Sequence, residues 1–346
     1  MSDLEFALDT FGDVTVGPDG QLIPQDQVIR DVVEQAVLAD ELGVDYFGLG
    51  EHHRDDFAVS SPEVLLGVIA GRTSRIRLGT AVTVLSTDDP VRLFQRFSTL
   101  QAASGGRAEV ILGRGSFTES YGLFGHDLHD YDLLFEEKLN LFHRLLQGGP
   151  VEWSGQTRPA LTGQEIFPPL GPKGLPTWIG VGGSPESVVR AVRYDLPMIL
   201  AIIGGNPTRF RPFVQLYHDA YAKLGKPPRP LGVHSPGHVA ETEEQAQEEA
   251  WAGYRVLRDR IGRERGWPPA DKAEFLREVS HGSMYVGTPE TVAQKIARTI
   301  RALGLTRFEM KYSQGTLPHP ALMTSIELYA TRVIPRVREL LADDAG

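Results

Sequence analysis

Short apolar runs rich in β-branched and aromatic residues recur along the chain, and each is followed by a longer segment whose apolar positions repeat with helical spacing. This alternation is typical of parallel strands that are joined by crossover helices. The pattern predicts strands at 5–8, 46–49, 77–82, 108–112, 177–181, 198–202, 231–239 and 307–311. It predicts helices at 25–42, 62–73, 90–104, 131–147, 187–193, 207–224 and 288–303.

Eight strands with crossovers, and no change of composition along the chain, favour a closed barrel over an open sheet. We therefore expect a single α/β domain over residues 1–346, an eight-stranded parallel (β/α)8 TIM barrel with insertions at the C-terminal face. Residues 148–176 predict a long irregular insertion, and residues 241–278 predict a charged helical insertion. Such insertions are often lids or interaction surfaces, and a tolerated surface insertion is an equal alternative.

Composition and charge exclude several classes of partner and of active site. The formal net charge is −10 and the acidic residues are spread over the predicted helices, which argues against a nucleic-acid partner. The chain contains no cysteine, which excludes thiolate metal sites, iron–sulfur clusters and cysteine nucleophiles. No leader-like segment opens the chain, and no apolar stretch approaches the ~18 residues of a membrane span, so we expect a cytoplasmic protein with no membrane partner. A redox reaction would need a bound cofactor.

Two histidines follow the second predicted strand, in the sequence Glu51, His52, His53. The active site of a parallel barrel lies at the C-terminal ends of its strands, so these residues are candidates for chemistry. An imidazole exchanges protons near neutral pH, which suits His52 or His53 for acid–base work while the other packs. Adjacent histidines on an extended segment point to opposite sides, so we expect no metal site here.

Two further strand ends carry weaker signals. Thr80, Ala81 and Val82 end the third predicted strand, where small residues would let a flat ring approach the backbone, although simple barrel packing explains them without further support. Arg114 follows the fourth strand between two glycines. Its guanidinium could bind phosphate oxygens, and a solvated arginine in a turn is an equal alternative.

A glycine-rich turn joins the fifth predicted strand to a helix. Gly182, Gly183 and Ser184 bring together free backbone N–H groups, a hydroxyl and a helix N-terminus, which is a typical anion site. The turn lacks the lysine of a nucleotide-hydrolysing P-loop and the spacing of a dinucleotide fingerprint, so a terminal monophosphate fits better than a dinucleotide. A tight turn with a capping serine is the alternative.

Four segments together resemble one known family. They are 51–53 (EHH), 78–92 (LGTAVTVLSTDDPVR), 105–115 (GGRAEVILGRG) and 180–184 (GVGGS). In order and spacing they are similar to the bacterial-luciferase-like flavin-dependent monooxygenases. The resemblance covers nearly the whole chain and implies a barrel that binds reduced FMN and uses dioxygen to oxidise a small organic substrate.

The resemblance also implies roles for the residues near the first two segments. His52 matches the catalytic histidine of the family, and His53 is its neighbour in the same motif. Ala81 and Val82, with Thr80 beside them, match the place of a non-proline cis peptide under the flavin ring.

The remaining two segments resemble the phosphate contacts of the family. Arg114 matches a phosphate-contacting arginine, and Gly182, Gly183 and Ser184 match the phosphate turn. The luciferase α-subunit has a reactive cysteine where this chain has Gly113, so light emission is not implied.

Partners follow from the same reasoning. The missing dinucleotide fingerprint predicts that a separate flavin reductase supplies reduced FMN. The family resemblance and the apolar stripes around 90–104 predict a homodimer or a higher homo-oligomer. Three other functions stay open: a deazaflavin-dependent hydride-transfer oxidoreductase, a non-catalytic flavin-binding protein, and a metal-dependent hydrolase on the same barrel.

Overall fold

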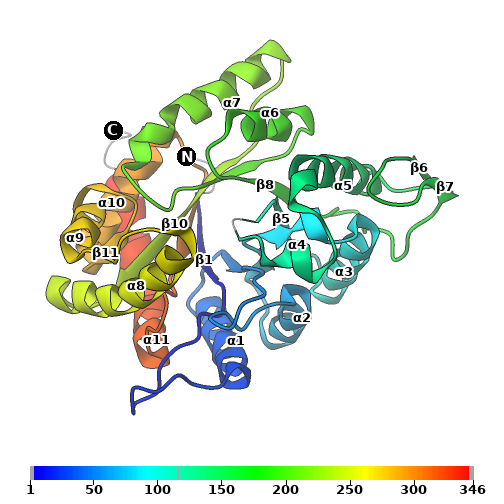
Figure 1. Cartoon of the computed structure of the whole chain (residues 1–346). Helices are drawn as coiled ribbons and strands as arrows, with labels where there is room; N and C mark the ends of the chain where they lie inside the picture. The colour runs from blue at the N-terminus through cyan, green and yellow to red at the C-terminus, as the bar shows by residue number, and fades with distance from the viewer. Residues whose placement is uncertain (1–3, 116, 343–346) are drawn as a thin grey trace.

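The computed structural model describes residues 4–115 and 117–342, and its central feature is a parallel sheet rolled into a barrel (Figure 1). The strands follow the hydrogen-bonded order β3-β2-β1-β12-β10-β9-β8-β5-β4, and every pair along this path is parallel. Leu78 of β3 also bridges Ala108, just ahead of β5, which brings the two ends of the path together. The predicted TIM barrel is therefore confirmed.

The barrel strands lie within two residues of their predicted ends, apart from the third. They are β1 (Glu5–Thr10), β2 (Tyr46–Leu49), β3 (Arg77–Thr80), β4 (Thr83–Val84), β5 (Val110–Gly113), β8 (Thr177–Val181), β9 (Met198–Ala201), β10 (Leu231–Val239) and β12 (Arg307–Lys311). The predicted third strand is divided into β3 and β4, and the peptide bond between Ala81 and Val82 is cis. A short extra strand, β11 (Tyr285–Gly287), pairs in parallel with the last residues of β10.

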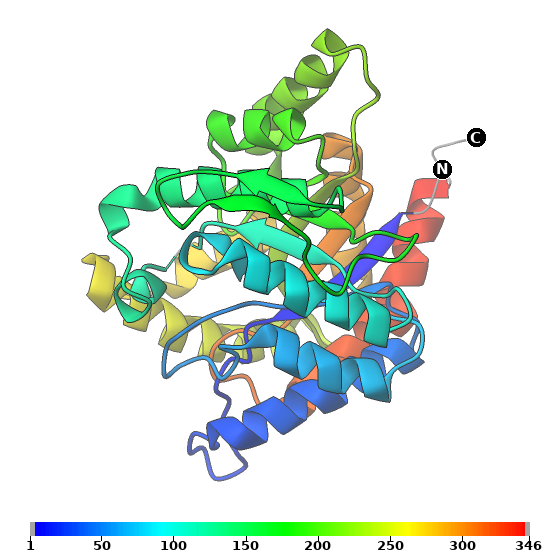
Figure 2. The ribbon, with the colours of Figure 1, turned by 90° about the vertical axis from the view of Figure 1, so that its right-hand side faces the viewer.

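Helices surround the barrel (Figure 2). The predicted helices are α1 (Gln25–Glu41), α2 (Pro62–Arg72), α3 (Pro90–Ala103), α5 (Tyr131–Leu145), α6 (Pro185–Arg193), α7 (Arg211–Lys223) and α10 (Pro289–Leu303). The sequence analysis missed α11 (His319–Leu328) and α12 (Ile334–Ala342), which follow β12. A π-helical turn at Tyr329–Val333 joins them and shifts the apolar periodicity, which weakens the pattern there. No described helix is long and apolar enough to cross a bilayer.

A charge network fills the barrel near the N-terminal ends of the strands. Inward positions alternate along a strand, so Glu5, Arg77 and Arg307 meet there with Glu109, which precedes β5. Arg307 Nη2 lies 2.7 Å from Glu5 Oε2 and 3.0 Å from Glu109 Oε2, and Arg77 Nη2 lies 2.7 Å from Glu5 Oε1. The Arg307 guanidinium lies 4.2 Å from the centre of the Trp178 ring. We call these four residues the lower layer; it has two cations and two anions.

The segment 148–176 is more regular than predicted. It contains an antiparallel hairpin of β6 (Val151–Trp153) and β7 (Leu161–Gln164). Trp153 Nε1 donates a hydrogen bond of 3.1 Å to Asn140 of α5. The segment therefore packs along the outside of the helical ring, and it reaches the C-terminal face where Arg158 Nε lies 3.0 Å from Asp89 Oδ2 at the start of α3.

The charged segment 241–278 is helical as predicted: it contains α8 (Glu243–Arg265) and most of α9 (Lys272–His281). The last turn of α8 reaches the loop after β2, where Arg54 Nη2 lies 2.6 Å from Glu264 Oε1. Arg265 lies 5.3 Å from the centre of the Phe117 ring, which follows β5. The helix thus spans from β10 to the loops after β2 and β5. Figure 2 shows α8, in yellow, at the end of the molecule opposite to the two chain termini.

Candidate active site

Side chains at the C-terminal ends of the barrel strands are partly accessible to solvent. Five positions that face inward there keep part of their surface exposed, namely Phe11, Val82, Gly180, Ala201 and His234. The lower layer of charges lies at the opposite end, where Glu5 and Arg77 line a surface cavity of about 490 Å³. We call the C-terminal end of the barrel the mouth, and the residues predicted from the sequence are compared with it below.

His52 lies in the loop after β2 at the edge of the mouth. Its ring centre lies 4.5 Å from that of Phe11, 4.7 Å from Phe57 and 5.0 Å from Phe117. Its Nδ1 lies 3.6 Å from Oε1 of Glu119, the first residue of α4 (Glu119–Leu123). Burial alone would raise the pKa of the Glu119 carboxyl, but the neighbouring imidazole lowers that pKa below its ordinary value. A carboxylate and three aromatic rings therefore hold His52 in place.

His53 points elsewhere, as adjacent residues in an extended loop should. Its Nε2 lies 3.0 Å from Oε1 of Glu51, and its ring lies against Phe124 with 5.0 Å between the centres. The other oxygen of Glu51 accepts a hydrogen bond of 2.9 Å from the backbone N–H of Val84. Glu51 therefore ties His53 to the backbone that follows the cis peptide.

The cis peptide lies in the wall of the mouth. Val82 is half-buried, and its side chain fills the space above two glycines: a Cβ on Gly113 would lie 2.4 Å from Val82 Cγ2, and one on Gly180 would lie 3.1 Å from Val82 Cγ1. Ala81 is buried, and so is the Thr80 side chain, whose hydroxyl donates to the carbonyl of Ile111 at 3.3 Å. Of the three residues predicted here, Val82 is the one that faces the mouth.

Arg114 and the glycine-rich turn lie side by side. Arg114 Nη2 donates to Ser187 Oγ at 3.4 Å, and Ser184 Oγ lies 2.8 Å from the same oxygen. Ser184 caps α6 and accepts a bond of 3.3 Å from the Ser187 N–H. The buried Arg190 donates to Ser187 at 3.5 Å. Two guanidinium groups and a helix N-terminus thus face one pair of hydroxyls, which is an arrangement that binds anions.

The two glycines leave the turn open. Gly183 has φ +103°, a conformation that residues with a Cβ rarely adopt. Gly182 is exposed, and a Cβ there would meet no atom within 4 Å. The backbone of this turn is therefore accessible to a ligand.

The sequence analysis missed two groups of acidic and histidine side chains. In the first group, Asp9, His234 and Glu309 each have one carboxylate oxygen or ring nitrogen within 4.8 Å of the others. A second such group, Asp31, Glu34 and His319, lies on α1 and α11 outside the barrel. The first group occupies inward positions of β1, β10 and β12, so alternation along the strands was a signal that could have found it. Ser187 and Arg190 lie in the predicted helix beside Ser184. The sequence gives no sign that Ser187 contacts Arg114 or that Arg190 contacts Ser187.

Comparison with known proteins gives the family. The model of the family described as luciferase-like monooxygenase matches residues 9–307. The chain belongs to this family. As a luciferase-like monooxygenase it is an oxidoreductase of the monooxygenase class, as the resemblance implied.

Relatives and solved structures place the luciferase-like monooxygenase more closely. Limonene 1,2-monooxygenase of Rhodococcus erythropolis is 29% identical over 307 residues, which cover 86% of this chain and 78% of the relative. The oxygenating constituent of 3,6-diketocamphane monooxygenase from Pseudomonas putida, in complex with FMN, has a TM-score of 0.78 at 18% identity and covers 96% of this chain and 98% of its own. An F420-dependent secondary alcohol dehydrogenase has a TM-score of 0.74 at 17% identity, with coverage of 96% and 99%. The fold is therefore shared by enzymes with different cofactors.

Proposed function

We propose that this enzyme binds reduced FMN at the mouth and uses dioxygen to oxidise a small apolar molecule. The observation that supports this most is the meeting of Arg114 with Ser184 and Ser187 at the same end of the barrel as His52. Bound reduced FMN would supply two electrons, so that one oxygen atom enters the substrate and the other leaves as water.

The residues around Arg114 fit the phosphate of FMN. Arg114 would offer a planar pair of N–H donors, and Ser184 with the start of α6 would offer a hydroxyl and backbone N–H groups. Arg114 also pairs with Asp132 at 2.8 Å, but the Asp132 side chain is 79% exposed. An exposed ion pair contributes at most about 1 kcal/mol, so a phosphate dianion can replace it.

The wall beside Val82 fits a flat ring system. The Val82 side chain packs back onto Gly113 and Gly180, and its half-buried surface forms an apolar support that faces the mouth. Glu51 holds the following backbone through Val84, which keeps this support in place. His52, at the edge of the same mouth, would hold or deliver a proton at a ligand oxygen.

The rim of the mouth favours an apolar substrate. Large apolar side chains in the segments that follow β5, β9 and α8 are exposed by 43% to 68%. Exposed apolar residues gathered around a concave site are typical of a binding surface for apolar ligands. They are Leu123, Phe124, Leu128, Ile203 and Trp267.

The proposal also includes a reductase partner, a cellular location and an oligomeric state. We propose that a separate flavin reductase delivers the reduced FMN, and that the enzyme works in the cytoplasm as a homodimer or higher homo-oligomer. Sedimentation of the purified protein, and turnover with and without an added reductase, test these two points.

Cofactor binding separates FMN from deazaflavin. The F420-dependent enzyme with the same fold keeps hydride transfer as a second candidate function. Titration of the purified protein with FMN and with F420 separately, followed by flavin fluorescence, should show tighter binding of FMN. Tighter binding of F420 would replace the monooxygenase proposal with hydride transfer.

Replacement of His52 tests the chemistry. His52→Ala should lower oxygen-dependent turnover with supplied reduced FMN about a hundredfold or more, because a positioned acid–base group contributes about 10²–10⁴-fold. His129→Ala is the control, because its side chain is 95% exposed. Equal rates for His52→Ala and the wild type would remove His52 from the reaction.

A further inference from the structure

A buried carboxylate holds His234 of β10 at the mouth. The Nδ1 atom of His234 lies 2.9 Å from Oδ2 of Asp9 on β1, and Asp9 has no exposed surface. A carboxylate bound to one ring nitrogen fixes the tautomer and orientation of an imidazole, and it leaves the other nitrogen for proton exchange. This pair therefore has the arrangement of an acid–base dyad.

The other ring nitrogen of His234 is directed to the open part of the barrel. Within residues 4–115 and 117–342, no hydrogen bond is formed by Nε2, and 12% of the side chain is exposed. The imidazole lies nearly parallel to the Phe11 ring, at 10° and 6.4 Å between centres. His52 contacts the same phenyl ring at 4.5 Å. The two histidines thus flank one aromatic ring at the mouth.

Glu309 sets the charge of this cluster. Burial, together with the nearby Asp9 charge, raises the pKa of Glu309 well above its ordinary value. Burial therefore favours the protonated form of Glu309. Asp9 Oδ1 and both Glu309 oxygens are buried and have no hydrogen-bond partner in the described structure.

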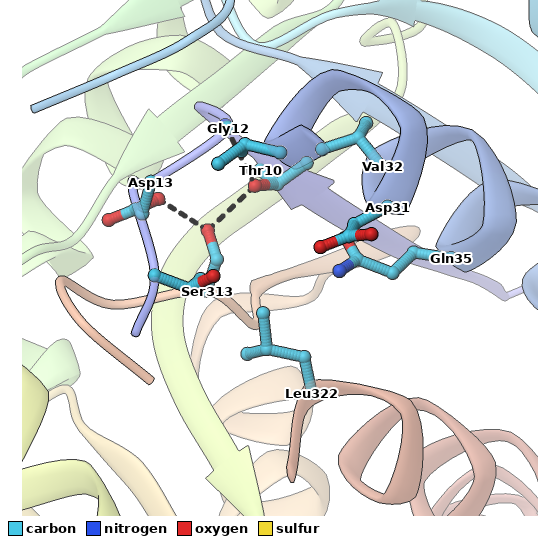
Figure 3. A pocket seen from close by; sticks show the side chains of 10 residues that line it. Thr10, Gly12, Asp13, Asp31, Val32, Gln35, Ser313 and Leu322 are labelled. Atoms are coloured by element: carbon cyan, nitrogen blue, oxygen red, sulfur yellow. Dashed lines mark hydrogen bonds between the residues drawn. The ribbon is translucent and has the colours of Figure 1, made fainter. Parts of the chain in front are cut away.

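The nearest lysine does not neutralise Asp9. Lys311 is the cross-strand neighbour of Asp9, but its Nζ lies 3.0 Å from Oδ2 of Asp13. Ser313 donates to the same Asp13 oxygen at 2.5 Å and lies 2.7 Å from Thr10, and Figure 3 shows this chain of contacts beside α1. Lys311 is thus bound to Asp13 and Ser313, and the His234 imidazole is the side chain that contacts Asp9 Oδ2.

We propose that His234 is a second proton-transfer residue of the mouth and that Asp9 is its positioning residue, an inference that rests on the proposed function. The protonated imidazole keeps its Nδ1–H on Asp9 and gives its Nε2 proton to a basic oxygen or nitrogen atom of the bound ligand. His234 is then neutral while Asp9 stays ionised. A proton from solvent then returns to Nε2.

Nitrogen NMR of the ligand-free protein tests the dyad. In protein with ¹⁵N-labelled histidine, the His234 signals are identified by their loss in His234→Asn. Neutral His234 should carry its proton on Nδ1, and Asp9→Leu, which keeps the size but removes the acceptor, should abolish this preference. The same tautomer in both proteins would overturn the role of Asp9. A melting temperature for each variant confirms that it is folded.

Addition of FMN tests the location. FMN should shift the His234 signals and leave those of His238, which belongs to the same strand, is 1% exposed and pairs with Glu249 at 2.7 Å. FMN binding that leaves the His234 signals unchanged would overturn the proposal while the proposed function stands. Failure of FMN to bind the wild type would instead remove the proposed function, and the tautomer experiment would still decide the dyad.

Kinetics test the proton transfer. His234→Asn should slow the reoxidation of bound reduced FMN by dioxygen, or the turnover that follows, about a hundredfold, with the FMN dissociation constant within about threefold of the wild type. His238→Asn should change neither quantity. Unchanged rates in His234→Asn would overturn the proposal. One equivalent of zinc or manganese in the purified protein, lost in Glu309→Gln, would also overturn it, because the cluster would then be a metal site.

Discussion

The two layers of charge inside the barrel use the same alternating strand positions and reach opposite results. In the lower layer Arg307 and Arg77 face Glu5 and Glu109, and the ionic contacts lie between 2.7 and 3.3 Å apart from one shorter pair. In the upper layer, the two acids Asp9 and Glu309 meet one imidazole, and three carboxyl oxygens stay without a partner in the described structure.

The difference separates a structural role from a functional one. Removing a charge from water is expensive, and a balanced layer offsets that cost by pairing. An acidic layer that is left partly unpaired is costly, and such groups persist mainly where a site needs them. We therefore expect loss of a lower-layer charge to reduce stability, and loss of an upper-layer group to affect the proposed chemistry.

The largest effect should come from breaking the lower layer. Arg307→Met would leave Glu109, which has no exposed surface, without its main cation, and should lower the free energy of unfolding by about 3–5 kcal/mol. Urea unfolding measures this loss. Arg336→Met is the control, because the pair of Arg336 with Glu290 is exposed and should contribute under about 1 kcal/mol. Equal losses of unfolding free energy in the two variants would show that the lower layer contributes no more than an exposed ion pair.

A smaller effect, on binding alone, should follow at the mouth. Arg114→Ala removes charge-assisted hydrogen bonds that contribute about 1.5–3 kcal/mol, so the FMN dissociation constant should rise roughly tenfold to a hundredfold. The melting temperature should stay near that of the wild type. Arg193→Ala, at an arginine that is 57% exposed at the other end of α6, should bind FMN normally. Normal binding by Arg114→Ala would place the phosphate elsewhere.

Glu309 of the upper layer should make the free energy of unfolding depend on pH. Because the pKa of Glu309 is raised from 4.5, the folded protein keeps a proton that the unfolded chain releases. The free energy of unfolding should therefore fall as pH rises from about 4.5 towards the raised pKa, by about 1.4 kcal/mol per pH unit from this group. Glu309→Gln should remove that contribution, as urea unfolding at several pH values would show. An unchanged slope would mean that Glu309 is ionised in the folded protein.

The smallest effect should come from the helix that crosses the C-terminal face. Glu264→Gln weakens the contact of α8 with Arg54, and because the Glu264 side chain is 44% exposed the loss should be below about 1 kcal/mol. Hydrogen exchange should still rise in the last turn of α8. Glu339→Gln, at an exposed residue of α12, should leave α8 unchanged. A loss of several kcal/mol would show that α8 is part of the core.

The barrel and one half of the candidate site could be predicted because their signals are local. Strand and helix periodicities each lie within one segment, and the chemistry around Arg114 and Ser184 lies in turns directly after strands. The hairpin in 148–176 was missed because its strands are short and mostly exposed, so they lack an apolar pattern. The division of the third strand depended on the family resemblance and not on periodicity.

The sequence by itself determined the order of strands and helices, the alternation of inward and outward side chains, and the residue types at the strand ends. Only the tertiary structure decided which inward side chains meet. Asp9 and His234 lie 225 residues apart, and the parallel register of β1, β12 and β10 brings them to 2.9 Å. That register results from closure of the whole barrel, and no segment of the chain contains it.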